Sequence, residues 1–219
     1  MQKNKKMVAK AKQGKPRKSF SAKDAEFAIL KVAYLLAPVD GEVAESERKT
    51  FDALAEHCRD VDVDESKQVI KSARLAVENM LKAYKKSSSQ FTGMMRMFGG
   101  VAQEDAMRIF MDEVRQVCDW SQFVRDSARV RRAFVMWMAM VMADGVLAKE
   151  EEKAIKQLQI LVNSYKLVDD SFIKSAQVEI SYLNQFHKQL NSAEDIEEDR
   201  RLHERIEDTE IRLANLIQA

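Results

Sequence analysis

Carboxylate side chains recur in the same arrangement at two distant places in this chain. Asp40 is followed by Gly41 and, seven residues after the aspartate, by Glu47. Asp144 is likewise followed by a glycine and, at the same interval, by Glu151. Carboxylate oxygens are the ligands that calcium and magnesium prefer in proteins. If the two Asp-Gly segments face each other, their two aspartates and two glutamates are candidate ligands for one divalent cation.

The same residues also have a purely structural interpretation. Aspartates often accept hydrogen bonds from backbone amides just ahead of them and so close a tight turn, and glycine permits the left-handed backbone that ends a helix. Ala44 and Ala148 fall where helix N-caps are expected, so Glu47 and Glu151 supply only the glutamate half of a capping box. Neither segment contains the full ligand series of a calcium-binding loop. The sequence leaves both interpretations open.

Few other residues are spaced for chemistry. His57 and Cys58 adjoin on a predicted helix, where neighbours point about 100° apart and do not share a site. The sequence contains no Gly-rich phosphate loop, nucleophile elbow or metalloprotease signature. We therefore predict that the protein is not an enzyme. Cys58 and Cys118 show neither disulfide nor metal-ligand spacing, which favours a reducing compartment.

The N-terminal segment is strongly basic. Residues 1–18 carry eight basic side chains and no acidic one, so the rest of the chain has a net charge of about −7. The tail is suited to nucleic-acid phosphates or to an anionic membrane surface. It is equally suited to the chain's own acidic C-terminal helix, or to keeping the protein soluble. The candidate contact residues are Lys3, Lys5, Lys6, Lys10, Lys12, Lys15, Arg17 and Lys18.

A second unusual segment, residues 85–101, is rich in Ser, Gly and Met. One interpretation is a loop folded over the core, in which Met side chains fill gaps. The other is an exposed, adaptable patch that binds a partner or a membrane. The residues of this predicted patch are Phe91, Met94, Met95, Met97 and Phe98.

Composition and periodicity predict an almost wholly helical protein, because the chain has only 6 Gly and 2 Pro and few alternating apolar runs. We expect helices over 21–37, 44–59, 62 or 64 to 84, 102–118, 122–143, 148–165, 170–190 and 193–217. Ser21 is the expected N-cap of the first, and Ser192 with Asp195 the capping-box start of the last.

The last predicted helix has an apolar seam at alternating intervals of four and three, formed by Leu202, Ile206, Thr209, Leu213 and Leu216. One interpretation is that the seam docks on the body of the protein, and the other is that it mediates self-association or binds a partner. The longest apolar run, residues 134–143, is too short for a bilayer, which needs about 20 residues, and the N-terminal segment lacks the apolar core of a signal peptide. We expect a cytoplasmic protein, with peripheral contact at the inner membrane as a variant of that location.

The phrases VDGEVAESE and ADGVLAKEE together resemble the two signature corners of TerB-like domains, found in tellurite-resistance proteins and in a DnaJ-like membrane co-chaperone. The segment YKLVDDSF (165–172) is similar to a phrase that follows the second corner in that family, with Lys166 where glycine is usual. Two departures are Pro38, matched by Met142 in the second copy, and the alanines at both cap positions. No J-domain His-Pro-Asp motif occurs, so the co-chaperone function does not carry over.

The resemblance implies an all-α, non-catalytic helical bundle with two pseudo-repeated helix–corner–helix units, of a kind linked to stress-response, envelope-associated and defence complexes. It also implies candidate metal ligands at Asp40, Glu47, Asp144 and Glu151. Glu42 matches a common acidic position of the family, and Val146 does not. We expect a basic flexible tail (1–19), a TerB-like domain (20–168, with an insertion at 85–101) and a charged helical extension (169–219).

The predicted function is therefore binding. The chain would be an adaptor in a stress-response or defence assembly, tuned by calcium or magnesium at the Asp-Gly corners, with a protein partner and with self-association through the C-terminal helix. The alternative is an accessory protein that binds nucleic acid or an anionic membrane through residues 1–18.

Overall fold

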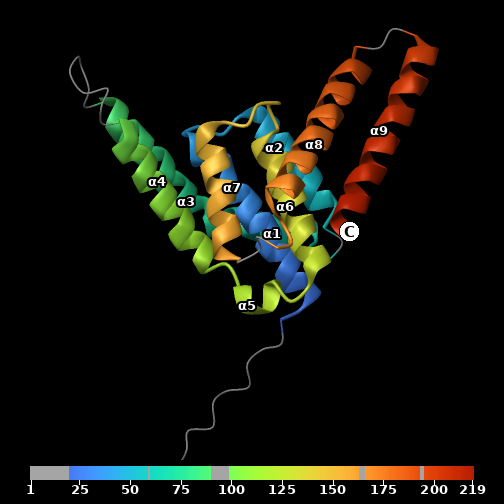
Figure 1. Ribbon diagram of the computed structural model, residues 1–219. Helices are drawn as coiled ribbons and strands as arrows, with labels where there is room; N and C mark the ends of the chain where they lie inside the picture. The colour runs from blue at the N-terminus through green and yellow to red at the C-terminus, as the bar shows by residue number, and fades with distance from the viewer. Residues whose placement is uncertain (1–19, 59, 90–98, 163–165, 193–194) are drawn as a thin grey trace, which may run out of the picture.

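The computed structural model describes residues 20–58, 60–89, 99–162, 166–192 and 195–219 (Figure 1). Within these ranges the chain forms helices and no strand, which confirms the predicted all-α fold. The helices, in chain order, are α1 (Ala22–Leu36), the 3-10 helix η1 (Ala37–Asp40), α2 (Glu45–Glu56), α3 (Val63–Ser89), α4 (Gly99–Arg115), α5 (Trp120–Phe123), α6 (Ser127–Val141), α7 (Lys149–Leu161), α8 (Asp170–Leu190) and α9 (Ile196–Gln218).

The centre of the bundle is formed by α1 and α6. Both helices are apolar around most of their circumference, which is typical of helices covered on all sides, and most of their residues are buried. The indole of Trp137 on α6 donates a hydrogen bond of 3.0 Å to the carbonyl of Ile29 on α1. Trp137 also packs edge-to-face against Phe134 and Trp120. The bond satisfies the only polar atom of the indole inside the core.

A half-buried ion pair joins the same two helices. Glu26 on α1 is 7 % exposed, and its carboxylate lies 2.6 Å from the guanidinium of Arg132 on α6. Arg132 also donates to the carbonyl of His57, and Glu26 accepts from the amide of Asp60. The pair therefore also anchors the connection between α2 and α3. Glu26 is the buried partner, whereas the Arg132 side chain is 34 % exposed.

Two helical hairpins diverge from this centre in Figure 1, α3 with α4 on the left and α8 with α9 on the right. The seam predicted on the last helix is buried within the chain. Leu213 belongs to the main core, whereas Leu202 and Ile206 form a smaller cluster with Phe186 of α8. The guanidinium of Arg205 lies 4.5 Å from the centre of the Phe186 ring. The seam thus packs within the chain, as the docking interpretation predicts, and self-association through α9 stays a prediction.

The structure corrects several predicted helix boundaries. Helix α3 continues to Ser89 and α4 begins at Gly99, so both ends of the segment 85–101, predicted to interrupt the helices, are helical. The helix expected over 122–143 is divided into α5 and α6, because Asp126 accepts a hydrogen bond from the amide of Arg129 and starts a new helix there. Asp195 alone caps α9, since its side chain accepts from the amide of Glu198, while the hydroxyl of Ser192 donates to the preceding helix. The capping box at Ser21 is present as predicted.

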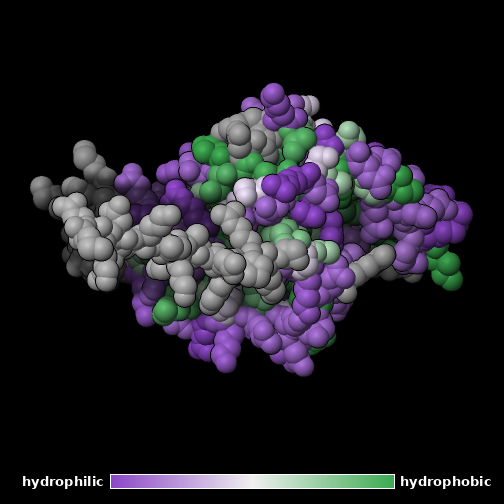
Figure 2. All heavy atoms as spheres, turned by 90° about the horizontal axis from the view of Figure 1, so that it is seen from below, coloured by the Kyte–Doolittle hydropathy of each residue, from purple (hydrophilic) through white to green (hydrophobic). Residues whose placement is uncertain are grey.

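The described surface is mostly polar. Figure 2, which views the molecule from below, shows hydrophilic side chains over most of the coloured area and apolar ones in small separate groups. Among the described helices none combines the length and the apolar character that crossing a membrane requires.

Candidate functional site

The first Asp-Gly corner connects η1 to α2. Gly41 has a φ of +109°, in the left-handed region that side chains with a Cβ disfavour. The Oδ1 of Asp40 accepts a hydrogen bond of 3.1 Å from the amide of Glu42. The hydroxyl of Tyr84, on α3, donates to the carbonyl of Val39. The Tyr84 ring is so close that a Cβ on Gly41 would lie 3.0 Å from two of its carbons.

The second corner connects α6 to α7 and repeats the local geometry. Gly145 has a φ of +94°, and the Oδ1 of Asp144 accepts a hydrogen bond of 2.8 Å from the amide of Val146. Both aspartates therefore form the turn proposed by the structural interpretation. The helix that contacts the corner differs: it is α3 at the first corner and α8 at the second. The amide group of Asn184 donates to the carbonyl of Met142 at 2.6 Å.

The two glutamates complete the half capping boxes expected from the sequence. The Oε2 of Glu47 accepts from the amide of Ala44 at 2.6 Å, and the Oε2 of Glu151 accepts from the amide of Ala148 at 2.7 Å. These bonds hold the carboxylates inside the protein, where only 6 % and 5 % of the two residues are exposed.

Burial is the largest cause of the raised pKa values of Glu47 and Glu151. Loss of hydration raises the pKa of Glu47 to about 7 and that of Glu151 to about 8, against the opposing effect of the backbone hydrogen bonds. Nearby carboxylates add to the rise. Asp40 and Asp144 both act on each glutamate, and Glu47 also acts on Glu151.

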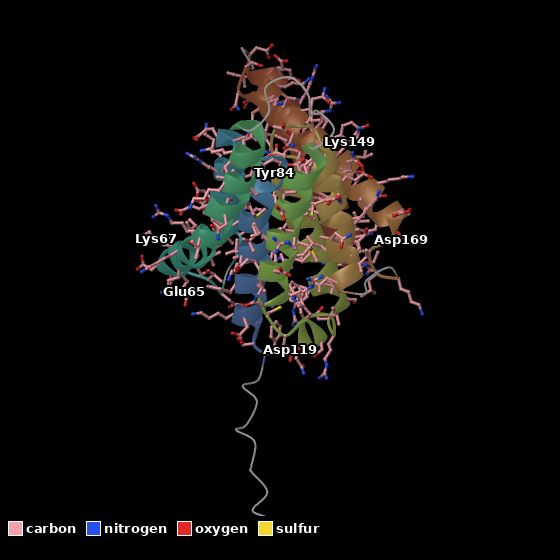
Figure 3. All side chains as sticks on the ribbon, turned by 90° about the vertical axis from the view of Figure 1, so that its left-hand side faces the viewer. Glu65, Lys67, Tyr84, Asp119, Lys149 and Asp169 are labelled. Atoms are coloured by element: carbon pink, nitrogen blue, oxygen red, sulfur yellow. The ribbon has the colours of Figure 1, made fainter. Side chains whose placement is uncertain are left out.

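These cross-interactions show that the two corners lie together. Burial raises the pKa of Asp40, and Asp144 of the other corner contributes to that rise. Helix α7, which follows the second corner, packs against η1, which precedes the first. Figure 3 shows Tyr84 on α3 and Lys149 at the start of α7 in the upper half of the view, and Asp119 at the bottom. The fold thus brings together the four carboxylates that the sequence singled out, in one acidic cluster made of Asp40, Glu47, Asp144 and Glu151.

The cluster has the donor chemistry for a hard divalent cation but is not closed around one. Each carboxylate accepts a hydrogen bond from a local amide through one of its oxygens. As the side chains stand, no three His, Cys, Asp or Glu residues of the described chain are grouped closely enough to hold a metal ion.

The family model for "Tellurite resistance protein TerB" matches residues 26–166, which include both corners and the core helices α1 and α6. The chain belongs to the TerB family. This membership relates it to tellurite resistance at the level of the family. No curated protein and no solved structure matches the chain.

The TerB match ends before α8, so Asn184, which supports the second corner, lies outside it. Lys188, also on α8, would place its ammonium 3.5 Å from a Cβ on Gly145. On the other side, Gln103 of α4 donates to Glu150 at 2.7 Å. The sequence does not predict that these residues or Tyr84 contact the corners. Each lies far along the chain from the corner that it contacts and belongs to no local motif.

A groove lies beside the first corner of this TerB protein, between α1, α2 and α3. Its volume is about 590 Å³, and most of its lining is apolar. Gly41 of the first corner and Glu47 of the acidic cluster both line the groove. The other residues that line it are Tyr34, Ala37, Glu42, Val43, Arg48, Phe51, Asp52, Ile70, Val77, Leu81, Lys85 and Met140.

The other candidate residues are the basic segment, the predicted apolar patch and the two cysteines. The basic side chains of residues 1–18 and the patch predicted at Phe91, Met94, Met95, Met97 and Phe98 lie outside the described residues. Burial raises the pKa of both Cys58 and Cys118 to about 12, so these two cysteines are thiols and not reactive thiolates at neutral pH.

Proposed function

We propose that this TerB-family chain is a non-enzymatic adaptor of a stress-response or defence assembly, and that its acidic cluster binds a divalent cation, calcium or magnesium. The observation that carries the proposal is the burial of Glu47 and Glu151 within electrostatic reach of two further carboxylates. Buried like charges destabilise a fold unless protons or a cation neutralise them. A cation would offset this repulsion and fix the two corners relative to each other.

The groove beside the first corner supports the adaptor role. It is walled by helices and lined largely by apolar side chains, which is the kind of surface that receives an apolar segment of a partner protein. Glu47 both lines the groove and belongs to the acidic cluster, so a cation bound at the cluster would alter the wall of the groove. A cation would in this way tune the binding of a protein partner.

The test of cation binding is calorimetric titration of calcium and of magnesium into the chelator-treated protein, with thermal unfolding measured in parallel. We expect saturable binding and a higher melting temperature with the preferred cation. Asp40→Asn combined with Asp144→Asn should abolish both effects. Asp199→Asn, on the exposed face of α9, is the matched control and should leave them unchanged. A melting temperature that is indifferent to cation and chelator in the unaltered protein would refute the proposal.

The second candidate function rests on the eight basic side chains of residues 1–18. In that case the chain binds DNA, RNA or anionic vesicles, and affinity falls with salt according to the number of phosphates contacted. Removal of residues 1–18 should then abolish binding of each of these ligands. A defined protein partner that the truncated chain still binds would assign the function to the helical body instead.

A further inference from the structure

A smaller cavity lies on the other side of the second corner, where α8 covers α6 and α7. Its volume is about 320 Å³. In Figure 1, α8 is the first helix of the right-hand hairpin and packs beside α6. Since α8 lies beyond the segment that matches the TerB family, one wall of this cavity comes from outside that segment. The lining residues that matter below are on α6, α7 and α8.

The floor of the cavity is apolar. Met138 of α6 is fully buried and Ile155 of α7 is 2 % exposed, and both line the cavity. Leu147, from the second corner, and Ile173 of α8 extend the same surface. This floor is suited to a short aliphatic group, because burying such a group against it removes apolar area from water.

A buried amide faces this space. Gln159 lines the cavity, although only 3 % of the residue is exposed to solvent. Its Nε2 donates a hydrogen bond of 2.8 Å to the carbonyl of Val168, which fixes the orientation of the amide. Its Oε1 has no hydrogen bond recorded within the described part of the chain. A buried acceptor without a donor is costly, so Oε1 calls for an N–H donor or a water molecule in the cavity.

The rim carries both signs of charge in equal number. Lys156 lies 2.6 Å from Glu152, and Asp170 adds its negative charge to the surroundings of this lysine. Asp170 and Lys174 stand one turn apart on α8, and for Lys174 no ion pair is recorded with any described residue. A ligand with a single charge would meet a like charge here, whereas a zwitterion can place each of its charges beside an opposite one.

From these features we propose that the cavity binds a free α-amino acid with an aliphatic side chain. Lys174 receives its carboxylate, Asp170 and the Oε1 of Gln159 receive its ammonium group, and the apolar floor at Met138 and Ile155 receives its side chain. Ligand cavities range from about 300 to 1,000 Å³, so this one suits a single amino acid better than a peptide or a nucleotide. None of the four carboxylates of the acidic cluster lines this cavity.

The probe is L-leucine, titrated calorimetrically into the full chain. Leucinamide, which lacks the carboxylate, 4-methylpentanoate, which lacks the ammonium, and glycine, which lacks the side chain, are the comparison ligands. We expect binding of L-leucine and at least tenfold weaker binding of each of the other three. Equal binding of L-leucine and 4-methylpentanoate would overturn the proposed role of Asp170 and Gln159.

Two substitutions locate the binding site. Lys174→Met removes an exposed ammonium, and Gln159→Leu removes the amide while keeping its approximate size; each should weaken L-leucine binding tenfold or more. Lys153→Met, at an exposed position of α7 that does not line the cavity, is the matched control and should bind L-leucine normally. Because Lys174 is exposed, its variant should fold normally, and unfolding curves check this. No L-leucine binding at millimolar concentration, or binding that Lys174→Met leaves unchanged, would overturn the proposal and leave water as the occupant.

Discussion

The two Asp-Gly corners have the same local structure but different neighbours. In each, a glycine with positive φ, an Asp that accepts from the amide two residues on, and a glutamate that caps the following helix make the same turn. The first corner is covered by Tyr84 of α3, inside the segment that matches TerB. The second is supported by Asn184 of α8, outside that segment. The local sequence determines the shape of the turn, and the surrounding helices determine which substitutions each corner tolerates.

Substitution of the two glycines should give the largest difference between the corners in the free energy of unfolding. Gly41→Ala places a Cβ 3.0 Å from the Tyr84 ring in addition to forcing a positive φ, whereas at Gly145 the nearest atom, the Lys188 ammonium, lies 3.5 Å away. A Cβ in left-handed backbone costs about 1–2 kcal/mol, and overpacking adds about 1–3 kcal/mol. We expect Gly41→Ala to lower the free energy of unfolding by about 2–5 kcal/mol and Gly145→Ala by about 1–2 kcal/mol, measured by urea denaturation. Equal losses would show that Tyr84 does not restrict the first corner.

The two glutamates should make the stability of the protein depend on pH, and the contribution of each corner should differ. Their folded pKa values, about 7 for Glu47 and about 8 for Glu151, exceed the ordinary value of 4.5. The folded state therefore binds more protons than the unfolded state, and stability falls as the pH rises from about 4.5 through 7 and 8. Chelator-treated protein should be more stable at pH 5 than at pH 9 through this effect.

Substitution by glutamine measures the contribution of each glutamate to this pH dependence. A glutamine keeps an oxygen for the Ala44 or Ala148 amide but carries no charge. At pH 9 we expect Glu47→Gln and Glu151→Gln each to stabilise the protein by about 1–3 kcal/mol, since a pKa unit corresponds to about 1.4 kcal/mol, with the larger gain at Glu151. At pH 4 the gain should vanish, because both glutamates are then protonated. Urea unfolding at both pH values measures the difference, and a gain independent of pH would contradict it.

The smallest effects should come from the residues that support each corner. Tyr84→Phe removes the donor to the Val39 carbonyl and keeps the ring, and Asn184→Ala removes the donor to the Met142 carbonyl. A single hydrogen bond contributes about 0.5–1.5 kcal/mol net. We expect each variant to lose about 1 kcal/mol, and Asn184→Ala to increase amide hydrogen exchange at the second corner only. Increased exchange at the first corner after Asn184→Ala would indicate that the corners move as one unit.

Much of this fold was predictable because its signals are local. The capping box at Ser21, the glutamates three residues into α2 and α7, and the seam from Leu202 to Leu213 are each written within a few turns of helix. The division between α5 and α6 was missed, although Asp126 was a recognisable N-cap. The apolar periodicity continues across that break and outweighed a single polar residue.

The sequence by itself determined the all-α class, most helices, the turn at each Asp-Gly pair and the identity of four carboxylates with the chemistry to bind a cation. Tertiary structure alone decided that Asp40 and Asp144 belong to one cluster, that Glu47 and Glu151 are buried, and that Tyr84 and Asn184 cover different corners. The reason is physical. Hydrogen bonds within a turn are fixed by spacing along the chain, whereas desolvation and charge coupling depend on which distant helices pack together.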